Sequence, residues 1–148
     1  MPISDWRATA PQAVQDDLDA LTNECLRFAT PLLEKHGFIA PFAYTITTDG
    51  EHRLAAAFDD PALEGAENPN ALMLELLRDG LRRRRKSYRA VGVVTEVQAT
   101  FGSALLVELE HRDGPALFVL MPFRVSKVLK RYSYGKLGAG EGTRQIWA

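Results

Sequence analysis

The sequence contains only one cysteine, Cys25, among its 148 residues. A single thiol cannot form an internal disulfide, and it excludes a zinc site built from several cysteines. No apolar run reaches the roughly 20 residues that a membrane-spanning helix needs. The first residues also lack the apolar stretch of a secretory signal peptide. We therefore expect one cytoplasmic domain over residues 1–148, with residues 1–10 as a flexible tail and with no membrane partner.

Histidines are also scarce, and their positions argue against a metal site. His36, His52 and His111 fall in three different predicted elements, and none has a second histidine or cysteine at ligand spacing. The glycines between residues 135 and 142 do not form a phosphate-binding loop, because the Gly-x-x-x-x-Gly-Lys-Ser/Thr pattern is absent. We therefore expect no metal and no cofactor.

The charges are divided unevenly along a chain of ordinary globular composition. Residues 1–77 carry 4 Lys and Arg against 13 Asp and Glu, a net charge of −9. Residues 78–148 carry 14 against 6, a net charge of +8. This asymmetry is typical of an anion-binding half, or of an acidic helix that lies over a basic sheet, within one chain or between two copies. The nearly neutral total of −1 favours the second interpretation.

Apolar spacing predicts two helices. The first covers residues 11–36 and ends at Gly37, with Pro31 expected to kink or divide it. Its apolar stripe recurs at steps of three and four residues: Val14, Leu18, Leu21, Cys25, Phe28 and Leu32. The second begins at Asn68 and Pro69, a cap and a first-turn proline, and ends within Arg82–Lys86.

Turn residues and alternation predict the strands. Asp49-Gly50 closes a hairpin in which Tyr44 lies opposite Leu54, and Asp113-Gly114 closes another in which Leu109 lies opposite Leu117. Strands are expected over 88–97, 104–111 and 116–124, and Ile146 and Trp147 are expected to add a short edge strand. The order α-β-β-α-β-β-β predicts an α+β, two-layer fold with helices packed on one face of an antiparallel sheet. Profilin-like and roadblock-like domains share this order.

Several short segments resemble small uncharacterised bacterial α+β proteins. They are Phe42-Ala43-Tyr44, Tyr88-Arg89-Ala90, and the run from Glu108 to Gly114 with Pro122-Phe123. The resemblance covers about residues 38–124. It implies the fold and no activity, because these are strand-and-turn patterns.

The acidic residues Glu108 and Glu110 stand next to His111, the one tight group of catalytic residue types. Alternation places both glutamates on one face of a strand and His111 on the other, so the three cannot act together. Solvated surface glutamates explain the pair better than catalysis. Should the chain bind a small molecule or act as a small enzyme, the pocket is expected between helices and sheet, with these lining residues: Tyr44, Arg89, Glu108 and His111.

The run Arg82-Arg83-Arg84-Arg85-Lys86 is the strongest concentration of charge. Arg82, Arg83, Arg85 and Lys86 are candidates for nucleic-acid or phosphate binding, but no recognition motif accompanies them. We expect instead that the run meets the acidic first helix.

The three long strands have apolar residues on both faces. Two helices on one face would leave the other to be covered by the C-terminal segment or by another subunit, because large bare apolar faces are usually interfaces. The expected interface residues are Val94, Leu106, Phe118 and Leu120. The leading prediction is thus a non-catalytic protein-binding or adaptor module, a homodimer that associates through its sheet and that also has the capacity to bind another protein.

Overall fold

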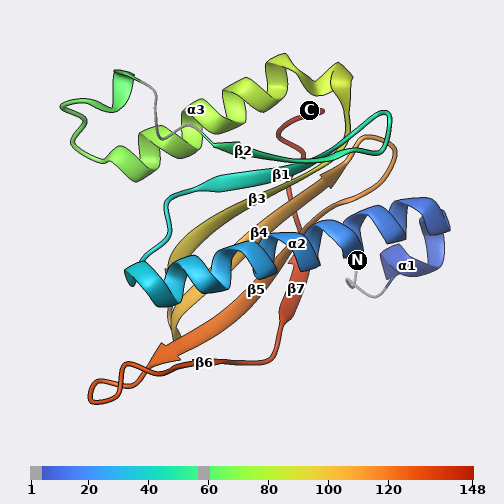
Figure 1. Ribbon diagram of the computed structural model, residues 1–148. Helices are drawn as coiled ribbons and strands as arrows, with labels where there is room; N and C mark the ends of the chain where they lie inside the picture. The colour runs from blue at the N-terminus through green and yellow to red at the C-terminus, as the bar shows by residue number, and fades with distance from the viewer. Residues whose placement is uncertain (1–4, 57–60) are drawn as a thin grey trace.

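The computed structural model describes residues 5–56 and 61–148 (Figure 1). The helices are α1 (Asp5–Thr9), α2 (Gln12–His36) and α3 (Pro69–Arg83), with 3-10 turns η1 (Pro61–Leu63) and η2 (Arg85–Ser87). The strands are β1 (Phe42–Thr47), β2 (His52–Ala56), β3 (Tyr88–Ala99), β4 (Gly102–His111), β5 (Ala116–Val125), β6 (Tyr132–Tyr134) and β7 (Gly138–Glu141). The predicted α+β class, with helices packed against an antiparallel sheet, is confirmed.

The seven strands form one curled antiparallel sheet in the order β2-β1-β3-β4-β5-β6, and β7 also pairs with β5. Both predicted hairpin registers are confirmed, because Tyr44 lies opposite Leu54 and Leu109 lies opposite Leu117. Gly50 has φ 89°, the left-handed conformation that the first hairpin turn requires.

Helix α2 crosses one face of the sheet (Figure 1) and buries a stripe of small and aliphatic side chains. These are Val14, Leu18, Leu21, Cys25, Ala29 and Leu33. The first four were predicted, but Ala29 and Leu33 replace Phe28 and Leu32. The small Ala29 faces the sheet. The Phe28 ring packs edge-on against the Phe42 ring, with 5.0 Å between the ring centroids. Pro31 lies inside the helix, which continues through it to the predicted cap at Gly37.

Helix α3 packs on the opposite face, a difference in detail from the predicted placement of both helices on one face. Its Leu77 and Leu81 join a second core cluster with Val91 and Val93 of β3. Val94, one residue further along the strand, belongs to the α2 cluster. Because successive side chains of a strand point to opposite faces, β3 is apolar on both sides and takes one helix on each.

Both ends of the chain pack against the domain. Residues 5–9 form α1, where Trp6 packs against the core and Arg7 donates two hydrogen bonds, of 3.0 and 2.7 Å, to Asp19; the flexibility of residues 1–10 stays a prediction. Residues 1–4 lie outside the described chain. Ile146 is buried in a segment without regular structure, and the added edge strands are β6 and β7 instead. In the described ranges, no helix has the length and apolarity to cross a membrane.

Candidate functional site

The four residues predicted to line a ligand pocket do not come together. Arg89 and His111 meet on one side of the sheet. Tyr44 lies in an aromatic group with Phe28. Glu108 lies on the opposite face of the sheet, as alternation along β4 predicted for it relative to His111.

Arg89 and His111 meet at Asp17 of α2. The Arg89 guanidinium donates to both carboxylate oxygens of Asp17, at 3.0 and 2.9 Å, and His111 Nε2 lies 2.9 Å from Asp17 Oδ2. The Asp113 amide donates to His111 Nδ1 at 3.0 Å. With Nδ1 accepting, the proton of the neutral ring is on Nε2, which therefore donates to Asp17.

Burial by itself would raise the pKa of the Asp17 carboxyl. The hydrogen bonds and positive charge of Arg89, together with the hydrogen bond from His111, outweigh that effect and hold this pKa below its ordinary value. The cluster joins α2 to β3 and β4 through a fully paired carboxylate. Asp17 could not be picked out from the sequence, because the pattern of an acidic helix predicts that its carboxylates are solvated surface groups.

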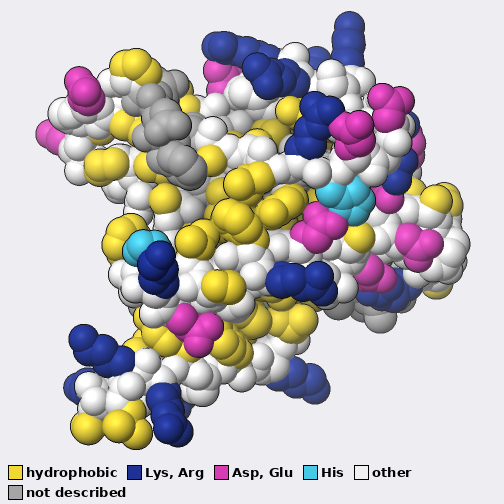
Figure 2. Space-filling model, viewed as in Figure 1, with side chains coloured by type: hydrophobic (Ala, Val, Ile, Leu, Met, Phe, Trp, Pro, Cys, Tyr) yellow, Lys and Arg dark blue, Asp and Glu magenta, His cyan; other side chains and the backbone are white. Residues whose placement is uncertain are grey.

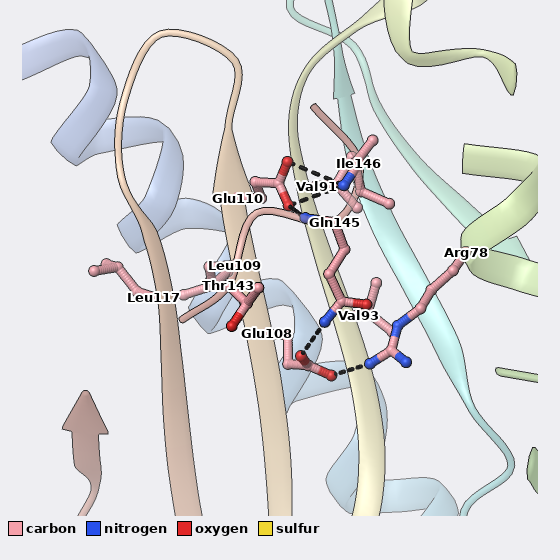
Figure 3. A pocket seen from close by; sticks show the side chains of 10 residues that line it. All are labelled: Arg78, Val91, Val93, Glu108, Leu109, Glu110, Leu117, Thr143, Gln145 and Ile146. Carbon is pink, nitrogen blue, oxygen red and sulfur yellow. Dashed lines mark hydrogen bonds and ion pairs between the residues drawn. The ribbon is translucent and has the colours of Figure 1, made fainter. Parts of the chain in front are cut away.

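Glu108 and Glu110 point from β4 toward the C-terminal segment (Figure 3). Glu108 accepts from Arg78 of α3 at 2.5 Å and from the Gln145 side chain at 3.2 Å. The cavity beside them measures only about 20 Å³, which is room for a water molecule and not for a substrate.

Glu110 is the main anchor of that segment. The residue is 5% exposed, and its carboxylate accepts hydrogen bonds from three successive backbone amides: Gln145 at 2.7 Å, Ile146 at 3.1 Å and Trp147 at 2.6 Å. This pairing could not be predicted from the sequence, because backbone amides carry no side-chain pattern.

Arg144 holds the same segment from the other direction. Its Nη1 donates to the carbonyl oxygens of His111 at 3.1 Å and Gly114 at 2.7 Å, which lie at the end of the β4–β5 hairpin. The Glu110 carboxylate, as acceptor, and the Arg144 guanidinium, as donor, thus both bind residues 144–147 to the sheet.

The basic run lies at the end of α3, with the side chains of Arg82, Arg83, Arg85 and Lys86 exposed. Arg82 donates to the Gln145 carbonyl at 2.8 Å, and Arg83 pairs with Asp79 at 2.8 Å. Within the chain, the expected contact between this run and the acidic helix is not formed, because α3 and α2 lie on opposite faces of the sheet. The acidic residues of α2 are paired elsewhere, Asp17 with Arg89 and Asp19 with Arg7.

One of the four predicted interface residues is buried. Val94 lies opposite Val107 under α2, so it cannot contact a partner. The other three are partly exposed on the second face: Leu106, Phe118 and Leu120. We call these three side chains the uncovered β4–β5 face. Leu106 lies directly opposite Leu120, and none of the three belongs to either core cluster of the described chain.

A larger cavity of about 450 Å³ opens between α2 and the β5–β7 edge. Its lining combines apolar side chains with polar ones, among them Arg7, Asp19, Thr22 and Asn23. The main apolar side chains are Trp6, Leu18, Leu109, Leu117, Val119 and Leu137. None of the four predicted ligand-binding residues lines it.

Comparisons with protein-family models, curated proteins and solved structures found no match for this chain. Over residues 5–56 and 61–148, no group of three or more His, Cys, Asp or Glu side chains is placed to hold a metal ion. Two surfaces open to a partner or ligand are the uncovered β4–β5 face and the cavity beside α2.

Proposed function

We propose that this chain is a non-catalytic binding module that self-associates through the uncovered β4–β5 face. The observation that carries the proposal is the direct pairing of Leu106 with Leu120, with Phe118 beside them, on a part of the sheet outside both core clusters. Contiguous apolar side chains of this kind gain free energy when a partner removes them from water.

A second copy of the chain is the occupant that fits this face. Twofold symmetry brings the same patch of both copies together, and an apolar row is complementary to itself. The net charge of −1 adds little repulsion between copies. A stable dimer buries about 800 Å² on each partner, so the surroundings of the three side chains also take part.

The side chains with catalytic potential support binding over catalysis. Glu108, Glu110 and His111 all hold the fold together through internal hydrogen bonds. Burial raises the pKa of the Cys25 thiol to about 12, which keeps it protonated and inert.

Size-exclusion chromatography with light scattering tests the proposal. We expect a dimer at high micromolar concentration and a monomer for Leu120→Asp. Leu54→Asp is the matched control, because Leu54 is an exposed leucine on β2, at the far edge of the sheet. A monomeric wild-type protein, or equal dissociation by both variants, contradicts the proposal.

The cavity beside α2 favours a second function, the binding of a small apolar molecule. Its volume of about 450 Å³ falls in the usual range of ligand sites, and its lining includes the polar residues Thr22 and Asn23. Val119→Trp would fill the cavity. If the cavity binds a ligand, compounds that raise the melting temperature of the wild type will fail to stabilise this variant, while the dimer persists.

A further inference from the structure

The loop between β5 and β6 holds two aliphatic side chains out in solvent. Val128 is 89% exposed and Leu129 is 66% exposed. The loop is closed by hydrogen bonds, because the Ser126 amide donates to the Arg131 carbonyl at 2.9 Å and the Lys130 amide donates to the Ser126 carbonyl at 2.8 Å. We call residues 124–131 the finger. The apolar tip of the finger, Val128 and Leu129, therefore lies in a loop that backbone hydrogen bonds close.

Cations surround this tip. Arg124, Lys127, Lys130 and Arg131 are all exposed, and no Asp or Glu occurs between residues 124 and 140. In Figure 2 the finger projects at the lower left, with hydrophobic side chains at its end and basic side chains beside them. The acidic Glu34 of α2 is engaged at the base of the finger, where it hydrogen-bonds Tyr134.

Further exposed apolar side chains gather at the same end of the molecule. Phe101 lies in the β3–β4 turn, which is at the finger end of β5 because Ala104 pairs with Pro122. Phe38 is exposed and follows Gly37, where an added Cβ would lie 4.0 Å from the Tyr132 hydroxyl of β6. This end thus combines exposed aromatic rings with an aliphatic tip and a basic rim.

From this arrangement we propose that the finger docks on an anionic lipid surface. Val128 and Leu129 enter the boundary between headgroups and acyl chains, and the surrounding cations contact lipid phosphates. The absence of an apolar run long enough to span a bilayer predicts no membrane partner, but docking on a lipid surface requires no such run.

A lipid surface fits this tip better than a nucleic acid or a protein groove. Nucleic acids use cations and stacked aromatic rings, and two aliphatic side chains at the tip add nothing to such contacts. A protein partner needs a broad complementary area, whereas the finger is a narrow projection. A bilayer boundary accepts a small apolar tip without a preformed pocket.

Sedimentation of the full chain with vesicles tests the proposal. We expect binding to phosphatidylcholine vesicles that contain one part in three of phosphatidylglycerol, and binding weaker by at least about tenfold to phosphatidylcholine alone. The double variant Val128→Ser with Leu129→Ser should lose at least about tenfold in binding to the anionic vesicles. Leu54→Ser, which removes an exposed leucine far from the finger, should bind like the wild type.

A fluorescent label reports insertion directly. A cysteine placed by Val128→Cys can be labelled selectively, since Cys25 is fully buried. We expect the emission of an environment-sensitive dye at this position to shift to the blue with anionic vesicles, and the emission of the same dye at Leu54→Cys to stay unchanged.

Three results overturn the proposal: equal binding to both vesicle types, no blue shift at position 128, or full binding by the double serine variant. Tight binding to a thymidine oligomer with no binding to vesicles overturns it in favour of nucleic acid.

Discussion

The carboxylate of Asp17 on α2 accepts a hydrogen bond from His111 Nε2 at 2.9 Å, although 94 residues separate the two positions. Arg89 on β3 donates to the same carboxylate. One side chain therefore joins the helix to two neighbouring strands, at the side of the molecule where the β4–β5 hairpin turns. His111 is 3% exposed, so its ring N–H depends on Asp17 for a partner.

Replacement of Asp17 by Asn should destabilise the protein. The variant keeps the size of the side chain but removes the charge that pairs with Arg89, and hydrogen bonds to charged groups contribute about 1.5–3 kcal/mol. We expect the free energy of unfolding in urea to fall by about that amount. Asp16→Asn is the control, because Asp16 contacts Gln12 on the exposed side of the same helix. Similar losses for both variants contradict the assigned role.

The stabilisation from Asp17 should disappear in acid. Its pKa is lower in the folded protein than its ordinary value of 3.8, so the unfolded chain takes up the proton first as pH falls. The contribution is therefore complete above about pH 4 and is lost as pH drops through the lower folded pKa. The difference in unfolding free energy between wild type and Asp17→Asn should narrow below pH 4. A difference that widens there would refute the linkage.

Local patterns predicted what depends on near neighbours in the chain. The registers around Tyr44 and Leu109 followed from two short turns and from alternation. The cap at Gly37 followed from the preference of glycine for positive φ. These features depend on a few adjacent residues, which is why they can be predicted without knowledge of the rest of the chain.

Features that join distant segments could not be predicted in the same way. Val94 was expected at an interface because β3 is apolar on both faces, and only the pairing with Val107 shows that the Val94 side chain lies on the face that α2 covers. The contacts of Glu110 with the amides of residues 145–147 depend on where an irregular chain end comes to rest. Three-residue and four-residue spacing carries no information about such placements.

The Glu110 carboxylate should be essential for holding the chain end. With Glu110→Ala, three backbone amides lose their acceptor in a largely buried place, so we expect a loss of about 2–4 kcal/mol in unfolding free energy. Trypsin should cut after Arg144 much faster than in the wild type. Glu75→Ala, a change at an exposed position on α3, is the control. An unchanged rate of cleavage would show that other contacts hold the segment.

Cys25 should react with thiol reagents only when the protein unfolds. Burial is the main reason that its pKa rises to about 12, so almost no thiolate exists at pH 8. We expect labelling by a disulfide reagent in native buffer to be slow and to accelerate with urea in step with global unfolding. Complete labelling within seconds in native buffer would contradict the buried position between α2 and β3.

Two glycines of the C-terminal region offer a matched test of how closely that region packs on β5. A Cβ at Gly142 would lie 2.9 Å from the carbonyl carbon and oxygen of Leu117, which are backbone atoms of a central strand and cannot move aside. A Cβ at Gly138 meets nothing within 4 Å. Both replacements by alanine restrict the unfolded chain equally, so the difference between them isolates the packing.

Gly142→Ala should lower the free energy of unfolding by about 1–3 kcal/mol, as overpacking against fixed atoms does. It also strains the hydrogen bond of 2.9 Å from the Gly142 amide to the Ala116 carbonyl. Gly138→Ala should stay within about 0.5 kcal/mol of the wild type, as surface changes usually do. Urea titrations followed by circular dichroism measure both values. If the two variants are equally stable, the chain does not run as close to β5 at residue 142 as the structure places it, and the anchoring by Arg144 and Glu110 would need to be reconsidered with it.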